Sequence, residues 1–222
     1  MSPVTTDRSR AFWALAGGLI SAALALVGLE RASETSFTSH MVQHVILLVV
    51  TAPLLALGAP VVLERLPARW NRLAHSMLGP YWVGWMALAI VLQGAAMVLW
   101  HLPGPFQSAV TSDPLHGLEH LTLIATAVLF WWVVLGAGPA RVVMGIVALF
   151  FATTACSALG AALALATHTW YPAYRSLDDQ AMGGVIMWSV AGAAYLVAAL
   201  ALFFVWLAGL ERAAPGELVT SP

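Results

Sequence analysis

Six long apolar stretches dominate this sequence and leave little choice of fold. They lie at about 11–29, 41–63, 80–100, 115–135, 140–166 and 180–209. The hydrocarbon core of a bilayer is about 30 Å thick, and a helix that crosses it needs roughly 20 apolar residues. Each stretch meets that length. We therefore expect an all-α, polytopic bundle of about six transmembrane helices embedded in the lipid bilayer.

The composition supports a membrane protein. Hydrophobic residues make up 61% of the chain and charged residues only 9%, whereas an ordinary soluble domain has about 45–50% and about 25%. So few charges cannot cover the surface of a soluble domain of this size. The connections between the stretches are short, so we interpret residues 1–222 as a single integral membrane domain.

Arginine positions predict the orientation of the bundle. All nine basic residues are arginines, and the net charge is −1. If the N-terminus is cytoplasmic, seven arginines fall on the cytoplasmic side and only Arg31 and Arg175 on the other. This distribution follows the positive-inside rule and puts both termini in the cytoplasm. Without a basic run, a nucleic-acid partner is not expected.

Histidines gather at one membrane face under this topology. Six of the seven fall at the outer face, namely His40, His44, His101, His116, His120 and His168. Two pairs have the i, i+4 spacing that puts both imidazoles on one side of a helix. Such a pair can chelate a metal, and imidazole suits copper, zinc, iron and nickel. A single interfacial histidine is equally compatible with a structural role, and His75 lies in the cytoplasmic, arginine-rich loop.

Two acids near that face are candidates to ligate a metal or to orient a ligating imidazole. They are Glu119 and Asp179, although an acid at the start of a helix, as at Asp179, is also favoured by the helix dipole. The segment 116–120 also matches H-x-x-E-H, a zinc-peptidase pattern. Five residues are a weak signal, and the other histidines favour a site shared by several helices.

Several motifs in order along the chain resemble those of the CtaG-type cytochrome c oxidase assembly factors. They are His40-Met41-Val42-Gln43-His44, Trp100-His101-Leu102-Pro103, H-x-L-E-H at 116–120, Phe130-Trp131-Trp132, Tyr171-Pro172-x-Tyr174, and the segment from Asp179 to Trp188 that resembles D-Q-x-x-G-G-x-I-M-W. The matches cover about two thirds of the chain. An ordered series of this kind is far more specific than any one motif.

The resemblance implies a bacterial plasma-membrane protein that helps to mature a caa-type haem–copper oxidase by handling copper. The family's histidine motifs carry over to His40, His44, His101, His116 and His120, and a further match is Asp179. We accordingly expect a copper site at the outer face, with Glu119, Asp179 and His168 in supporting roles. The protein would be a metallochaperone for oxidase subunits and not an enzyme.

Three other functions remain open at this point. A b-type cytochrome would use two imidazoles from facing helices as haem ligands, but it needs only one histidine per helix and leaves the i, i+4 pairs unexplained. A permanent accessory subunit of the oxidase would hold its metal without transferring it. A zinc hydrolase would use Glu119 in catalysis.

Overall fold

The computed structural model describes residues 8–136 and 141–213, and over that part the chain is helical with no strand. Six helical spans there are long and apolar enough to cross a membrane. They consist of α1 (Arg8–Ala23) with η1 (Leu24–Gly28); α3 (Phe37–Ile46), η2 (Leu47–Thr51) and α4 (Ala52–Leu63); α6 (Trp82–His101); α8 (Asp113–Leu135); α9 (Val142–Ala164); and α10 (Leu177–Ile186), η4 (Met187–Ala191) and α11 (Gly192–Ala213). The predicted all-α bundle of six spans is confirmed. Residue 140, where the fifth predicted span begins, lies outside the described residues.

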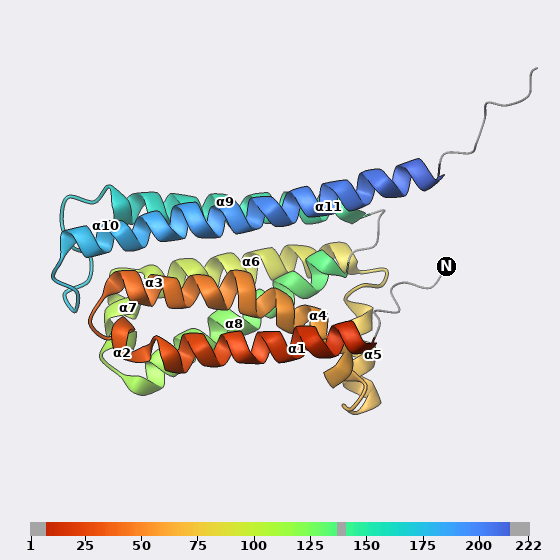
Figure 1. Cartoon of the computed structure of the whole chain (residues 1–222), viewed down its shortest axis with the longest axis horizontal. Coiled ribbons are helices and arrows are strands. Elements are labelled where there is room, and N and C mark those ends of the chain that lie inside the picture. The colour runs from red at the N-terminus through yellow and green to blue at the C-terminus, as the bar shows by residue number, and fades with distance from the viewer. Residues whose placement is uncertain (1–7, 137–140, 214–222) are drawn as a thin grey trace, which may run out of the picture.

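Three short helices connect the spans. The helices α2 (Glu30–Ser33) and α7 (Pro103–Val110) lie at one end of the bundle, and α5 (Ala68–Ser76) lies at the other (Figure 1). The helix α5 falls in the arginine-rich stretch that the sequence suggests is a loop. It is amphipathic, because Trp70 and Leu73 are three residues apart and share a side of the helix.

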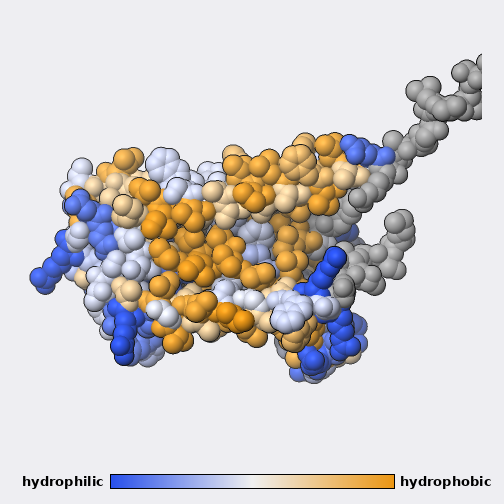
Figure 2. Space-filling model, in the orientation of Figure 1, coloured by the Kyte–Doolittle hydropathy of each residue, from blue (hydrophilic) through white to orange (hydrophobic). Residues whose placement is uncertain are grey.

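The spans pack side by side along the long axis of the molecule. One layer contains α9 beside α10 and α11, and α1 packs on α4 at the far side of the bundle, with α6 and α8 in contact with each other (Figure 1). The start of α1 and the end of α11 lie at the same end. We call the opposite end, where α3 and α8 begin and α6 finishes, the histidine end. On the face that Figure 2 shows, hydrophobic residues cover the surface between the two ends and hydrophilic residues gather at both ends, as a bilayer requires.

A proline interrupts the helical hydrogen bonding of the second span, and a side chain of another span supplies a hydrogen bond there. Pro53 has no backbone N–H and its ring disfavours the regular helical turn before it. The wide turn η2 directly precedes it, a local change that such interruptions commonly produce. The carbonyl of Leu48 in that turn accepts a hydrogen bond of 2.9 Å from the indole of Trp131 in α8. The second and fourth spans are thereby tied together inside the membrane.

Two glycines bring α9 and α10 into backbone contact. A Cβ atom on Gly184 would lie 2.5 Å from the carbonyl oxygen of Gly160, and one on Gly160 would lie 2.6 Å from the carbonyl oxygen of Gly184. Real Cβ atoms do not approach so closely, so both positions require glycine. Small residues are the usual means of close helix packing in membranes. This contact fixes α10, which carries Asp179, at the histidine end.

Aromatic side chains form a packed layer at the histidine end. Phe37 of α3, Phe106 of α7 and Tyr171 of the α9–α10 connection are fully buried. The ring of Tyr171 stacks on Phe37 with centroids 5.1 Å apart and lies 4.1 Å from that of Phe106. The ring of Phe106 also lies 5.0 Å from that of His40. This layer gives the polar site described next an apolar, rigid boundary.

Candidate metal centre

The start of α3 is held by a carboxylate from the last span. The side chain of Asp179 accepts hydrogen bonds from the hydroxyl of Ser36 at 2.9 Å and from the backbone N–H groups of Phe37 and Thr38 at 2.7 and 3.1 Å. The first N–H groups of a helix have no partner within the helix. Asp179 supplies that partner although it lies 141 to 143 residues further along the sequence. It thereby positions the helix that carries the first histidine pair.

Five histidine side chains come together at this end. They are His40 and His44 from α3, His101 from the last residue of α6, and His116 and His120 from α8. The ring centroids of neighbouring imidazoles lie between 4.4 and 6.0 Å apart. All except His116 are buried. Three separate spans therefore deliver imidazoles to one small volume.

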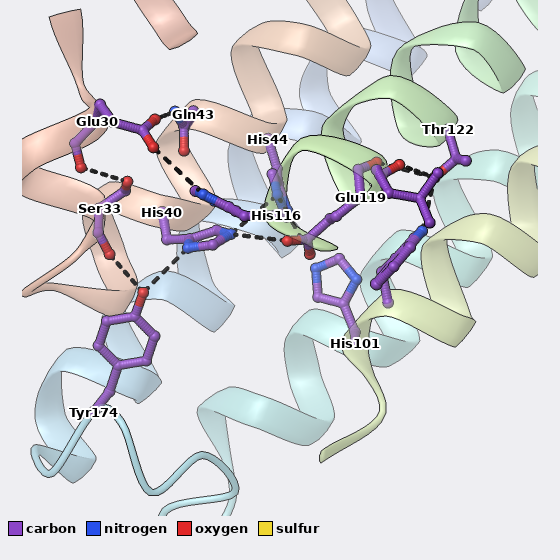
Figure 3. A network of polar contacts seen from close by, with 12 residues as sticks. Glu30, Ser33, His40, Gln43, His44, His101, His116, Glu119, Thr122 and Tyr174 are labelled. Atoms are coloured by element: carbon purple, nitrogen blue, oxygen red, sulfur yellow. Dashed lines mark hydrogen bonds and ion pairs between the residues drawn. The ribbon is translucent and has the colours of Figure 1, made fainter. Parts of the chain in front are cut away.

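Glu119 adds a carboxylate to the imidazoles (Figure 3). Its side chain is 0% exposed, and its two oxygens lie 3.8 Å from Nε2 of His40 and 3.7 Å from Nε2 of His44. No described residue makes a hydrogen bond to either oxygen. A buried carboxylate without hydrogen bonds is costly, and such charges are usually paired or coordinate a metal.

The tautomer of His40 follows from its neighbour Tyr174. Burial raises the pKa of the Tyr174 phenol, so the phenol keeps its proton. It donates that proton to the carbonyl of Ser33, which can only accept. In the 3.1 Å hydrogen bond between His40 and Tyr174, Nδ1–H of His40 is therefore the donor and the Tyr174 oxygen the acceptor. Nε2 of His40 is left with its lone pair directed at His44 and Glu119 (Figure 3).

Two more imidazoles are oriented in the same way. Nδ1 of His101 lies 2.7 Å from the carbonyl of Met97, which can only accept, so Nδ1 carries the proton. Nδ1 of His116 lies 3.4 Å from a carboxylate oxygen of Glu30. The amide of Gln43 donates to the other carboxylate oxygen of Glu30 at 3.1 Å. Partners of this kind fix the tautomer and ring orientation of metal-binding histidines.

The polar atoms of the cluster that make no hydrogen bond are of the kinds that can bind a metal ion. Among the described residues, Nε2 of His101, His116 and His120, Nδ1 of His44 and both oxygens of Glu119 are buried without a hydrogen-bond partner. Buried polar atoms are rarely left so. Nε2 of His44 donates a hydrogen bond of 3.1 Å to Nε2 of His40 in this structure, and two nitrogens bound to one tetrahedral ion at about 2.0–2.1 Å lie roughly 3.3 Å apart. His44 can offer Nε2 to an ion once its proton moves to Nδ1, which makes no hydrogen bond to a described residue. These residues therefore fit a metal ion bound by nitrogen and carboxylate oxygen.

The structure brings together most of the residues that the sequence selects. All five histidines of the family motifs and Glu119 lie in the cluster. Asp179 makes no contact with an imidazole within the described part of the chain and instead holds the start of α3. His168 is exposed on the α9–α10 connection, and His75 is exposed on α5.

Three polar residues of the site were not selected from the sequence. Tyr174 lies in a quoted motif, but nothing in the spacing shows that it reaches His40. Glu30 follows the first span as an ordinary interfacial acid, and Gln43 lies in the quoted motif at 40–44, where nothing in the spacing shows that it reaches Glu30. Only the predicted cluster of histidines could have indicated that such residues lie nearby, because buried imidazoles need acceptors for the proton on Nδ1.

A family model described as cytochrome c oxidase caa3 assembly factor (Caa3_CtaG) matches residues 3–209. This range includes every residue of the cluster and all six spans up to the last turns of α11. No curated protein and no solved structure matches the chain.

Proposed function

Because the chain belongs to the cytochrome c oxidase caa3 assembly factor family, we propose that it binds copper in the histidine cluster and supplies it to a haem–copper oxidase during assembly. The observation that carries this proposal is the convergence of five imidazoles and the carboxylate of Glu119. Within the described part of the chain, no hydrogen-bond partner reaches Nε2 of His101, His116 and His120 or either oxygen of Glu119. Haem–copper oxidases contain copper, so copper is the cargo in this proposal.

The donor set agrees with copper as the bound metal. Imidazole is a good ligand for copper, and a single carboxylate balances part of the charge of the ion. The centroid distances of 4.4 to 6.0 Å between neighbouring imidazoles place these rings in mutual contact. Such packing favours an ion over a porphyrin, which needs a broad plane between its two axial histidines.

The enclosure of the site supports a carrier more than a hydrolase. A catalytic zinc keeps an open position for water and substrate. Glu119 and the imidazoles of His40 and His44 have side-chain exposures of 0%, 1% and 2%, which leaves little access for a substrate. The arginine distribution supports a plasma-membrane protein whose histidine end faces outward, where oxidase subunits would receive the metal.

Complementation of a strain that lacks this protein tests the proposal. Cells that express the His40→Ala, His44→Ala double variant should assemble the oxidase polypeptides but yield a copper-deficient, inactive oxidase, with partial rescue by added copper. Cells with the wild-type chain or with His75→Ala should contain an active oxidase. The measurement is copper per haem in the purified oxidase. A fully metallated oxidase in the double variant would overturn the proposal.

A further inference from the structure

Two sets of metal ligands overlap in the cluster and share one residue. The first set is His40, His116 and His120, and the second is His40, His44 and Glu119. Within each set the ligand atoms lie within 4.8 Å of one another. We infer that the cluster has two alternative positions for one copper ion, an outer position and an inner position, and that the ion passes between them while it stays bound to His40. This inference rests on the proposed function.

The shared histidine limits the cluster to one ion at a time. Nδ1 of His40 donates to Tyr174 and is therefore unavailable as a ligand. Nε2 has one lone pair, which binds one ion. An ion in the outer position takes His40 away from the inner set, and the reverse is equally true. The two three-ligand positions cannot be filled together.

The two positions differ in their access to solvent. The residues of the inner set are almost completely enclosed. His116 of the outer set has a side chain that is 15% exposed, and it contacts Glu30, whose side chain is 38% exposed. A cation that approaches the histidine end thus meets Glu30 and His116 first.

Glu30 is held where it can act as the first contact for the ion. The amide of Gln43 donates to Glu30 at 3.1 Å and to the carbonyl of Ala25 at 3.0 Å, which fixes the amide between them. The other carboxylate oxygen of Glu30 faces Nδ1 of His116. A negative charge at this place attracts a cation and leaves Nε2 of His116 free to bind it.

The negative charge of Glu119 gives the inner position a higher affinity for copper than the outer position. The outer set offers three neutral imidazoles, and the inner set replaces two of them with His44 and the carboxylate of Glu119. A unit charge next to a cation counts for much more in a buried site than in water. In the transfer, the bonds from the ion to His116 and His120 break as the bonds to His44 and Glu119 form. As Nε2 of His44 binds the ion, its proton moves to the unpartnered Nδ1 of the same ring. The imidazoles therefore remain neutral, and no electron is transferred.

Two variants separate the positions in the purified full-length protein. Glu119→Gln removes the charge of the inner position, so Cu²⁺ should bind about 10–100-fold more weakly and escape quickly to EDTA. His116→Ala removes the solvent-side ligand, so both the uptake of Cu²⁺ and its loss to EDTA should slow by about tenfold or more, with little change in affinity. Stopped-flow absorbance and equilibrium competition measure the rates and the affinity.

Two control variants and the number of copper ions bound per chain distinguish the possible outcomes. His168→Ala removes an exposed histidine outside the cluster and should match wild type, and Glu119→Asp keeps the charge and should keep the slow release. Wild type should bind one copper ion per chain. Two ions per chain, or equal effects of Glu119→Gln and His116→Ala on affinity and rates, would overturn the two-position inference. A wild-type chain that binds no copper would instead overturn the proposed function itself.

Discussion

The phenol oxygen of Tyr174 lies 3.1 Å from Nδ1 of His40 and links that imidazole to the backbone carbonyl of Ser33. Tyr174 in the α9–α10 connection thereby joins α3 to α2, because His40 and Ser33 lie 134 and 141 residues before it in the sequence. Because the phenol has only one proton, the chain of hydrogen bonds can run in one direction only. Nε2 of His40, the ligand atom in the proposed copper site, is therefore left without a proton by a residue that is not itself a proposed ligand.

Removal of this phenol should weaken metal binding without removing a ligand. In Tyr174→Phe, Nδ1 of His40 loses its acceptor and the imidazole is free to change tautomer, so we expect the affinity for copper to fall by about 10–100-fold. Tyr171→Phe is the matched control, because the Tyr171 hydroxyl donates only to the backbone carbonyl of His101. Equal copper affinities for the two variants, measured by competition, would show that Tyr174 does not orient His40.

Asp179 and its neighbour Asp178 should differ in their effect on stability. Asp179→Ala removes the three hydrogen bonds that the carboxylate accepts at the start of α3, so the free energy of unfolding should fall by about 0.5–2 kcal/mol. Asp178→Ala removes an exposed side chain and should have little effect. Thermal unfolding in detergent measures both variants, and indistinguishable curves would argue against the anchoring role of Asp179.

The close contact between α9 and α10 predicts a severe effect of a single methyl group. In Gly184→Ala the new Cβ atom would lie 2.5 Å from the carbonyl oxygen of Gly160, so the helices must separate, at a cost of about 1–3 kcal/mol. Gly192→Ala in the same span meets its nearest atom at 3.6 Å and should be tolerated. A melting temperature for Gly184→Ala that equals that of Gly192→Ala would contradict this account of the packing.

Reporter fusions test the predicted orientation. With seven arginines against two, fusions after Leu210 and within residues 64–79 should report a cytoplasmic location, and fusions near Gly104 and near Ala173 should report an external one. The measurement is the ratio of alkaline phosphatase to β-galactosidase activity at each position. An external signal from residues 64–79 would turn the histidine end toward the cytoplasm.

The spans could be predicted because a bilayer imposes one requirement on every crossing helix. Length and apolar character locate all six to within a few residues. Features set by contacts between spans carry no such local signal. The pair Gly160 and Gly184 looks like ordinary membrane glycine in the sequence, and the turn η2 depends on Trp131 of another helix as well as on Pro53.

The candidate site divides in the same way. The i, i+4 spacing shows that His40 and His44 share one side of a helix, but only the structure shows that His101 of α6 and His120 of α8 meet them. Sequence reasoning assigned Asp179 a role beside the imidazoles because it lies at the same membrane face. The carboxylate instead binds the backbone N–H groups of Phe37 and Thr38, because the first N–H groups of a helix have no acceptor within the helix.

The most direct test of the central claim is the metal content of the purified protein, measured by mass spectrometry together with its visible and paramagnetic resonance spectra. We predict one copper ion per wild-type chain with nitrogen coordination and no Soret band. The His40→Ala, His44→Ala double variant should retain its helix content, because the apolar spans are unchanged, and should lose the copper, whereas His75→Ala should match wild type. A double variant that keeps its copper, or a wild-type protein that contains haem and no copper, would contradict the account.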